Sequence, residues 1–562
     1  MKALHSLRRA AALAVLALGF LSAEAAPVSR VVAAGALLGS GVLPGFPEAL
    51  AAANHPMSEK DKLSFTAAFN AIDNRNWPRA LSQAAQIKNP LAAKIIAWAY
   101  LSADDTKPGF DELVKFTNEN PDWPLQETLL AKAERALPAT MPPARLIAWF
   151  AGQEPLTGEG MIRLGEALLA TGETAYGAGW IARAWVTQVF NGTKQREIFS
   201  SYSQYLKGQP SIARMDMLLW EHEAAQAQWL LPQVPDDLRR IAGARIAFME
   251  YASNAKSIFN ALPSKAQKDP GVMFEYARYL RRHGDDDDAR RKLLSIEHPE
   301  TLPFPEKWWI ERHVAARKAI AEKEYRDAYE LAAHSGLTNG NDFADAEWLA
   351  GWLALRFLDK PKEALKHFTT LDAGVTYPIS SARAEYWLGR AAQATGDKIA
   401  AAAAYAKAAQ HPNTFYGQLS AESTLLSNQA LELPVTPGVD KAKWDDFIGD
   451  ELVKAIQLIK QVDEERYVRT LAYQIADKAQ DGATLILLSE LLWTFDHPSI
   501  SVRIAKKASQ KQILLTDYLY PVFAVPAFPG AGTPPEPALV LGFARQESEF
   551  NPRAVSSAGA RW

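Results

Sequence analysis

The sequence predicts an all-α protein whose main part is an α-solenoid, a superhelix of helical hairpins resembling tetratricopeptide repeats. Apolar residues recur at i, i+3 and i+4 almost without interruption from Met57 to about Leu433. Two segments, Ala346-Glu-Trp-Leu-Ala-Gly351 and Ala384-Glu-Tyr-Trp-Leu-Gly389, look like equivalent first helices of successive hairpins. Their spacing is close, but not equal, to the tetratricopeptide period of about 34 residues. Each hairpin is expected to bury a face on its neighbour, and a long solenoid of this kind curves and can close into a ring.

The first 25 residues have the organisation of a secretory signal. Arg8 and Arg9 precede an apolar stretch at residues 10–21, and Ala23-Glu-Ala25 is a cleavage site of the small-x-small type. We therefore expect residues 1–25 to be removed during export and the mature protein to be in the periplasm.

Residues 26–56 are expected to form a flexible leader. Their apolar patch, Val31 to Leu43, is interrupted by glycines and is shorter than the roughly 20 apolar residues that a spanning helix needs. No transmembrane span is therefore expected in the mature chain. A lipid-associated segment is the alternative for this patch.

Residues 57–433 are assigned to the superhelix because turn-forming segments repeatedly separate helical patterns. These segments begin at Asn76, Gly172, Gly284, Glu324, Asp359 and Gly396. Most of the 16 tryptophans lie here, and their helical spacing favours packing between helices over stacking on a sugar. The run Asp285–Asp288 is expected to be a helix cap and loop, because the EF-hand spacing with its closing glutamate is absent. His222 lacks the second histidine of a zinc-binding helix.

Residues 434–520 are predicted to form a small helical linker domain. A helical pattern resumes near Trp444, after a Pro- and Gly-containing linker that ends at Gly438. Residues 521–537 contain six prolines and are expected to be a largely extended connector.

Composition restricts the classes of function. Of the 562 residues, 48% are hydrophobic and 22% are charged, which is typical of folded globular proteins, and the length suggests more than one domain. The net charge of -3 gives no overall attraction for nucleic acid. Since there are no cysteines, disulfides, thiolate metal sites and thiol catalysis are excluded. No metal or other cofactor is expected.

A last apolar helix is predicted to place one carboxylate, that of Glu547. Thr533-Pro-Pro-Glu536 has the form of a capping box with Pro534 at the first helical position, and Asn551-Pro552 should end the helix. Burial and the negative end of the helix dipole would both favour a protonated Glu547, as a general acid requires. A solvated glutamate is the alternative from spacing alone. Glu549, two residues on, should point away from Glu547 and be surface charge.

The segment Ala544-Arg-Gln-Glu-Ser-Glu-Phe-Asn-Pro552, followed by Ser556-Ser-Ala-Gly-Ala560, resembles the opening of the catalytic domain of soluble lytic transglycosylases. By this resemblance residues 538–562 begin a lysozyme-like α domain, Glu547 is the catalytic acid and base, and Ser548 helps to hold the glutamate and substrate. Phe415-Tyr-Gly417 also resembles the end of the family's superhelical domain. The resemblance implies cleavage of the β-1,4 bond between N-acetylmuramic acid and N-acetylglucosamine, with formation of 1,6-anhydromuramoyl ends. Peptidoglycan strands are the implied substrate, and other cell-envelope proteins are conceivable partners.

The chain departs from the family pattern after Gly559-Ala-Arg561, where Gly-Leu-Met-Gln would be expected and Trp562 stands instead. About 25 residues of a domain are too few to bury a core of their own. Family membership and the activity of this polypeptide are therefore separate questions. A non-catalytic scaffold that binds glycan or protein is the main alternative, and a hydrolytic glycosidase with a second carboxylate is a third.

Overall fold

The computed structural model describes residues 43–52, 57–424, 433–462, 464–525, 527, 532–556 and 558–559. All regular secondary structure within these ranges is helical, and they contain no β-strand. The all-α prediction is thereby confirmed. The expected signal, residues 1–25, lies outside the described residues.

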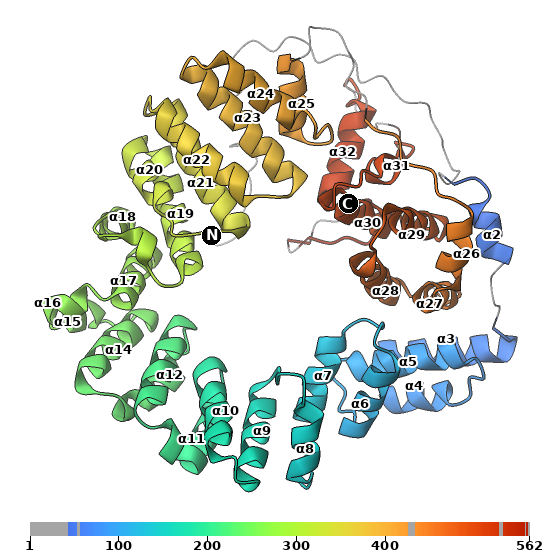
Figure 1. Cartoon of the computed structure of the whole chain (residues 1–562), viewed down its shortest axis with the longest axis horizontal. Coiled ribbons are helices and arrows are strands. Elements are labelled where there is room, and N and C mark those ends of the chain that lie inside the picture. The colour runs from blue at the N-terminus through green and yellow to red at the C-terminus, as the bar shows by residue number, and fades with distance from the viewer. Residues whose placement is uncertain are drawn as a thin grey trace.

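A superhelix of paired helices forms most of a ring (Figure 1). Its first part contains α3 (Glu59–Asp73), α4 (Trp77–Ala84), α5 (Pro90–Ser102), α6 (Phe110–Glu119), α7 (Gln126–Arg135), α8 (Pro143–Phe150), α9 (Gly158–Ala170), α10 (Thr174–Thr187), α11 (Gly192–Leu206), α12 (Gln209–Trp220), α13 (Ala224–Leu230) and a 3-10 turn, η1 (Leu231–Gln233). Its second part contains α14 (Asp236–Met249), α15 (Ala255–Asn260), α16 (Ser264–Gln267), α17 (Pro270–His283), α18 (Asp286–Leu294), η2 (Pro299–Thr301), α19 (Pro305–Ala321), α20 (Tyr325–Ala333), α21 (Gly340–Arg356), α22 (Pro361–Gly374), α23 (Pro378–Ala394), α24 (Lys398–Ala408) and α25 (Phe415–Thr424).

The predicted hairpin turns are confirmed. Each of the six turn segments lies between two helices that pack on each other, namely α3 and α4, α9 and α10, α17 and α18, α19 and α20, α21 and α22, and α23 and α24. At Gly172, Gly284 and Gly396 the backbone is left-handed, with φ between 85° and 91°. An acidic residue follows each of these glycines immediately before the second helix. Local turn chemistry thus sets the hairpin repeat.

Two glycines confirm the predicted equivalence of α21 and α23. A Cβ atom added to Gly351 would lie 2.6 Å from the Phe368 ring on α22, and one added to Gly389 would lie 2.6 Å from the Tyr405 ring on α24. In both hairpins the missing side chain lets the aromatic ring of the second helix press against the backbone of the first.

Tryptophans supply much of the packing between helices, as expected. Trp98, Trp185 and Trp308 are almost completely buried, and Trp220 and Trp309 are no more than 3% exposed. Other tryptophans, among them those of α21 and α23, remain half-buried.

A second group of helices fills the rest of the ring. It comprises α26 (Ala442–Gly449), α27 (Glu451–Lys460), α28 (Glu465–Lys478), α29 (Gly482–Thr494), α30 (Pro498–Gln510) and α31 (Thr516–Leu519). Buried apolar residues of these helices belong to the same hydrophobic core as those of α3 to α9. Tyr467 on α28 contacts Phe69 and Trp98, with ring centroids 5.3 and 5.9 Å away.

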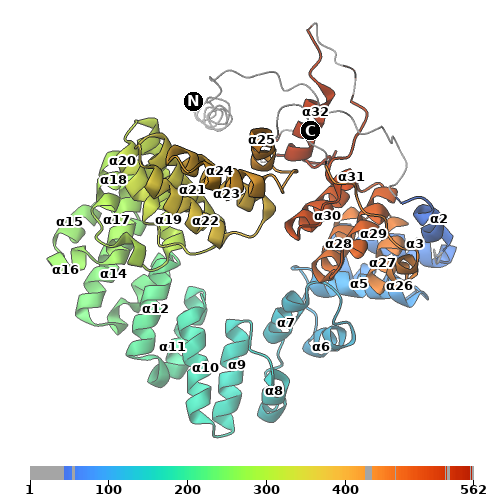
Figure 2. The same cartoon turned by 45° about the horizontal axis from the view of Figure 1, so that its top comes forward.

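These helices close the ring, because they contact both ends of the superhelix (Figure 2). On the N-terminal side, Lys478 pairs with Asp122 at 2.6 Å. On the C-terminal side, the Asn413 side chain, just before α25, donates to Ser509 Oγ at 3.1 Å. The sequence did not decide whether the superhelix closes into a ring. The structure shows a closed ring.

Residues 43–52 differ from the expected flexible leader. They include α2 (Phe46–Ala52), where Phe46 is fully buried and meets Trp444 of α26 edge to face with ring centroids 5.4 Å apart. Leu43 and Leu50 are also buried. This segment is therefore part of the core.

Candidate functional site

The predicted C-terminal helix is α32 (Pro537–Glu547). Glu536 occupies its N-cap position and Pro537 its first turn, so the helix starts three residues later than the Pro534 expected from the sequence. Pro537 suits this place because a helix leaves its first N–H groups unpaired. Glu547 is the last residue of the helix, in the final turn as predicted.

The helix ends before Asn551-Pro552, by a different mechanism from the one predicted. Ser548 is the C-cap, and its backbone N–H donates to the Ala544 carbonyl at 3.1 Å. Glu549 and Phe550 then both have positive φ values, 52° and 62°. Two consecutive left-handed residues turn the chain sharply. Glutamate and phenylalanine rarely adopt this backbone conformation, and they keep it only where tertiary contacts hold them.

Glu547 is exposed, and the expectation of a buried apolar helix is wrong for the described structure. No residue of α32 is buried, and Leu539 and Phe543 are 54% and 60% exposed. Among the described residues no helix covers this face. The desolvation expected to favour a protonated Glu547 is therefore absent here, although its position at the helix end is as predicted.

Three side chains attach α32 and the following turn to helices α28, α30 and α31. Arg545 Nε donates to the Leu519 carbonyl at 2.6 Å, and its guanidinium lies 4.7 Å from the Tyr520 ring centroid. Glu549 accepts from both Arg503 and Lys506 on α30, the latter at 2.7 Å. Arg553 pairs with Glu465 at 3.6 Å.

Glu549 is therefore not the free surface charge that its spacing predicted. Its side chain is only 16% exposed and lies between two cations. The left-handed turn after α32 places its carboxylate beside α30. Its structural role is to anchor the turn that follows the candidate catalytic residue.

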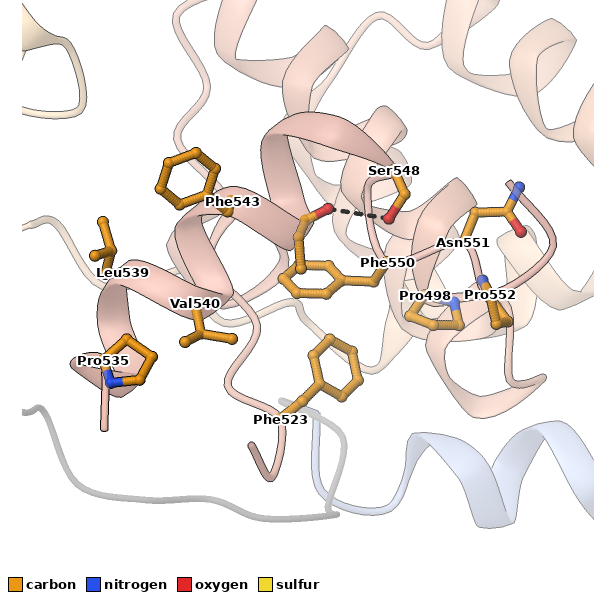
Figure 3. A pocket seen from close by; sticks show the side chains of 11 residues that line it. Pro498, Phe523, Pro535, Leu539, Val540, Phe543, Ser548, Phe550, Asn551 and Pro552 are labelled. Atoms are coloured by element: carbon orange, nitrogen blue, oxygen red, sulfur yellow. Dashed lines mark hydrogen bonds between the residues drawn. The ribbon is translucent and has the colours of Figure 1, made fainter. Parts of the chain in front are cut away.

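An open apolar groove of about 680 Å³ lies beside α32 (Figure 3). Phe523 and Phe550 pack against each other in its lining, with ring centroids 4.7 Å apart. The Ser548 hydroxyl, at its edge, donates to the Ala544 carbonyl at 3.1 Å. Glu547 does not line the groove, whose lining consists of Pro498, Phe523, Pro535, Leu539, Val540, Phe543, Ala544, Ser548, Phe550, Asn551 and Pro552.

Sequence reasoning missed the contribution of Phe523. It lies in the Pro-rich stretch that we expected to be an extended connector, yet it packs on both Trp493 and Phe550. The available signal was that Phe523 belongs to an apolar run, Val522 to Val525, at the start of the proline-rich stretch.

Within the described parts of the chain, no three or more His, Asp or Glu side chains come together as a metal site would require. Asp286–Asp288 form the first turn of α18, after Asp285, and pair with nearby cations, including Lys318, Arg290 and Arg291. His222 lies against Arg278 and Glu275 instead. No helix in the described ranges is long and apolar enough to cross a bilayer.

Comparisons with known proteins give a structural likeness. No protein-family model matches the sequence, and neither does any curated protein. The 70 kDa soluble lytic transglycosylase of Escherichia coli superposes with a TM-score of 0.57 and 16% identity over 90% of this chain and 79% of its own. Its complex with bulgecin A gives the same TM-score at 15% identity.

An inactive mutant of the lytic transglycosylase Slt from Pseudomonas aeruginosa, carrying glutamine in place of a glutamate, superposes with a TM-score of 0.61. It is 17% identical over 88% of this chain and 78% of its own. At these identities the likeness shows a shared fold. The superhelical fold of this chain thus resembles that of soluble lytic transglycosylases.

Proposed function

We propose that this chain belongs to the soluble lytic transglycosylases and acts on peptidoglycan glycan strands. The observation that carries the proposal is the combination of two independent signals. The ring-shaped fold resembles those enzymes over 90% of the chain, and the Glu547-Ser548 pair of the family's catalytic opening falls at the end of a helix docked on that ring.

In the proposed reaction Glu547 first acts as an acid and then as a base. Its carboxyl protonates the oxygen that leaves the muramoyl C1 atom. The resulting carboxylate then takes the proton of the muramoyl C6 hydroxyl, whose oxygen bonds to C1 and closes the 1,6-anhydro ring. No water is consumed, so a single carboxylate suffices, in contrast to ordinary glycosidases. Ser548 is proposed to position Glu547 and the substrate.

Acid catalysis near neutral pH requires Glu547 to be shielded from water. The exposed apolar side chains of the same helix, Leu539 and Phe543, are where an element covering Glu547 would pack. We accordingly propose that activity belongs to a form of the protein in which this face is covered.

The division of the chain follows from the same proposal. Residues 1–25 would direct export to the periplasm, residues 57–433 would be the superhelix, residues 434–520 the linker domain, and residues 538–562 the start of the catalytic domain. The proposed connector, residues 521–537, would place that domain on the ring.

The test replaces Glu547 by glutamine in the full-length protein and measures products released from purified sacculi by mass spectrometry. Loss of 1,6-anhydro products in Glu547→Gln, with normal release in Glu536→Gln, is the expected result. Glu536 is a suitable control because it is an exposed carboxylate at the opposite end of the same helix. Normal cleavage by Glu547→Gln would refute the assignment of Glu547 as the catalytic residue. Products of the parent protein with reducing ends in place of anhydro ends would indicate a hydrolase.

The exposure of α32 favours a second candidate, a periplasmic scaffold that binds glycan or envelope proteins without cutting. Co-sedimentation with sacculi that remain intact would support this alternative. Anhydro products in the same assay would exclude it.

A further inference from the structure

A cluster of half-buried aromatic and arginine side chains lies at the C-terminal end of the superhelix. We call Trp348, Trp387, Arg390 and Tyr416, from α21, α23 and α25, the tryptophan–arginine surface. The Trp387 ring centroid is 6.2 Å from that of Trp348 and 6.4 Å from that of Tyr416. In contrast to the buried tryptophans that pack the hairpins, none of these side chains is fully buried. Next to them, the Phe415 side chain is 67% exposed.

This surface carries a guanidinium group, that of Arg390, without a carboxylate partner among the described residues. The Arg390 guanidinium donates to the Tyr386 hydroxyl at 2.9 Å and lies 6.0 Å from the Trp387 ring centroid. Glu385, nearby in sequence, is buried against Lys407 at 2.8 Å instead. The indole N–H groups of Trp348 and Trp387 have no hydrogen-bond acceptor either, but both nitrogen atoms are buried, so Arg390 is the donor that a ligand can reach.

An unpaired arginine among aromatic rings suits one class of ligand. Aromatic faces pack against the C–H faces of sugar rings, and a guanidinium forms strong, geometrically specific hydrogen bonds with a carboxylate. A saccharide that carries a carboxylate would supply both the apolar faces and the missing acceptor.

The surface is close to the candidate catalytic helix. The Tyr520 hydroxyl donates to the carbonyl of Asn413, two residues before α25, at 3.2 Å, and the Tyr520 ring also stacks with Arg545 of α32. Figure 2 shows α25 next to α32 across the seam of the ring. A glycan bound on this surface would therefore lie at the end of the superhelix that is next to α32.

We propose that the tryptophan–arginine surface is an accessory binding site for a carboxylate-bearing glycan, with Arg390 selecting the carboxylate. The proposal deepens the proposed function, on which it rests for the choice of a muramoyl sugar as ligand. It assigns this surface to binding and leaves the cleavage step to Glu547.

The experiment compares two soluble probes in the Glu547→Gln background, where cleavage is not expected. One is the disaccharide of N-acetylglucosamine and N-acetylmuramic acid, whose lactyl group carries a carboxylate, and the other is N,N′-diacetylchitobiose, which is neutral. Tryptophan fluorescence titration and saturation-transfer NMR measure their affinities. We expect the acidic probe to bind about tenfold more tightly, as one charge-assisted hydrogen bond would give.

Three variants test whether Arg390 causes the preference for the acidic probe. Arg390→Gln should abolish it, whereas Arg390→Lys, which keeps the charge, should retain part of it. Arg183→Gln is the matched control, because Arg183 also lies over a tryptophan ring, that of Trp180 at 4.9 Å, but belongs to α10 in a different part of the superhelix. It should bind both probes as the parent does.

An unchanged preference in Arg390→Gln would overturn the inference, and so would equal or undetectable binding of the two probes to the parent. These failures are separate from failure of the proposed function. Probe binding that is lost in Arg390→Gln, in a protein that releases no anhydro products from sacculi, would refute the proposed reaction alone. Anhydro release without selective probe binding would refute this inference alone.

Discussion

Replacing Gly389 by alanine should destabilise the last hairpins of the superhelix, although alanine is the better helix former. The new Cβ would lie 2.6 Å from Cε1 of Tyr405. That ring has little freedom to move, because it is 9% exposed, packs on Tyr386, and donates its hydroxyl to Gln393 at 3.2 Å. Overpacking of this kind costs about 1–3 kcal/mol, against a gain of about 1 kcal/mol in helix propensity. We expect a net loss of about 1 kcal/mol.

The control is Gly243→Ala in α14, where no atom would lie within 4 Å of the added Cβ. It should stabilise the protein by about 0.5–1 kcal/mol through helix propensity alone. The two variants make the same chemical change and differ only in the space available. The expected effects therefore have opposite signs.

Hydrogen exchange monitored by mass spectrometry is the suitable assay, because a solenoid can open locally without unfolding as a whole. Peptides of α23 and α24 should exchange several-fold faster in Gly389→Ala, since about 1.4 kcal/mol corresponds to a factor of ten. If Gly389→Ala protected these helices as well as, or better than, the parent, the close contact would not be the reason for glycine, and the reasoning would be refuted.

Four further substitutions test other contacts. Burial and the neighbouring Arg278 lower the pKa of His222 to about 4, whereas burial raises the pKa of its neighbour Glu275 to about 7. Neutral His222 thus contributes stability that is lost as pH falls from 6.5 to about 4, and protonated Glu275 contributes stability that is lost as pH rises from 4.5 to about 7. Relative to the parent, His222→Asn should gain stability in urea titrations towards low pH, and Glu275→Gln should gain it towards neutral pH. Glu549→Gln should loosen the turn after α32 by about 1–2 kcal/mol, seen as faster proteolysis there, because it leaves two cations without their partner. Tyr467→Ala should weaken the N-terminal seam by about 2–3 kcal/mol and increase the radius of gyration measured by small-angle scattering.

For each of these substitutions, one result would contradict the prediction. The pH slopes of the two variants must have opposite signs, and parallel curves would show that one assignment is wrong. Glu536→Gln is the control for the turn after α32. Equal rates of proteolysis in Glu549→Gln and Glu536→Gln would show that Glu549 does not anchor this turn. Tyr251→Ala, at a half-exposed tyrosine outside the seam, should leave the scattering profile unchanged. An unchanged profile in Tyr467→Ala would mean that other contacts suffice to close the ring.

The parts of the fold that depend on neighbouring residues could be predicted from the sequence. Hairpin turns were recognisable because Gly172, Gly284 and Gly396 each combine a left-handed backbone with a following acidic residue, and these preferences are local. The equivalence of Gly351 and Gly389 could be found because two similar segments, Ala346–Gly351 and Ala384–Gly389, both end in glycine. The segment from Leu43 to Leu50 was missed, although its apolar residues have helical spacing, because nothing nearby in the sequence shows what covers them.

The parts that depend on distant contacts could not be predicted. Glu549 looked like surface charge because its partners, Arg503 and Lys506, are more than 40 positions away in the chain. The apolar pattern of α32 predicted burial, but a pattern does not say whether a partner covers the helix. The sequence therefore predicted correctly that Glu547 lies at the end of its helix, and incorrectly that this helix is buried.

Closure of the ring determines the order in which the chain can fold. Hairpins of the superhelix need only their neighbours and can form as they emerge during synthesis. The seam instead joins Asp122 to Lys478, which are 356 positions apart. Contacts so distant in sequence form late, because a long loop must close first. The first helices must therefore wait, with part of their apolar surface unpaired, until almost the whole chain is available. A chaperone that binds exposed apolar helices would be most useful during that interval.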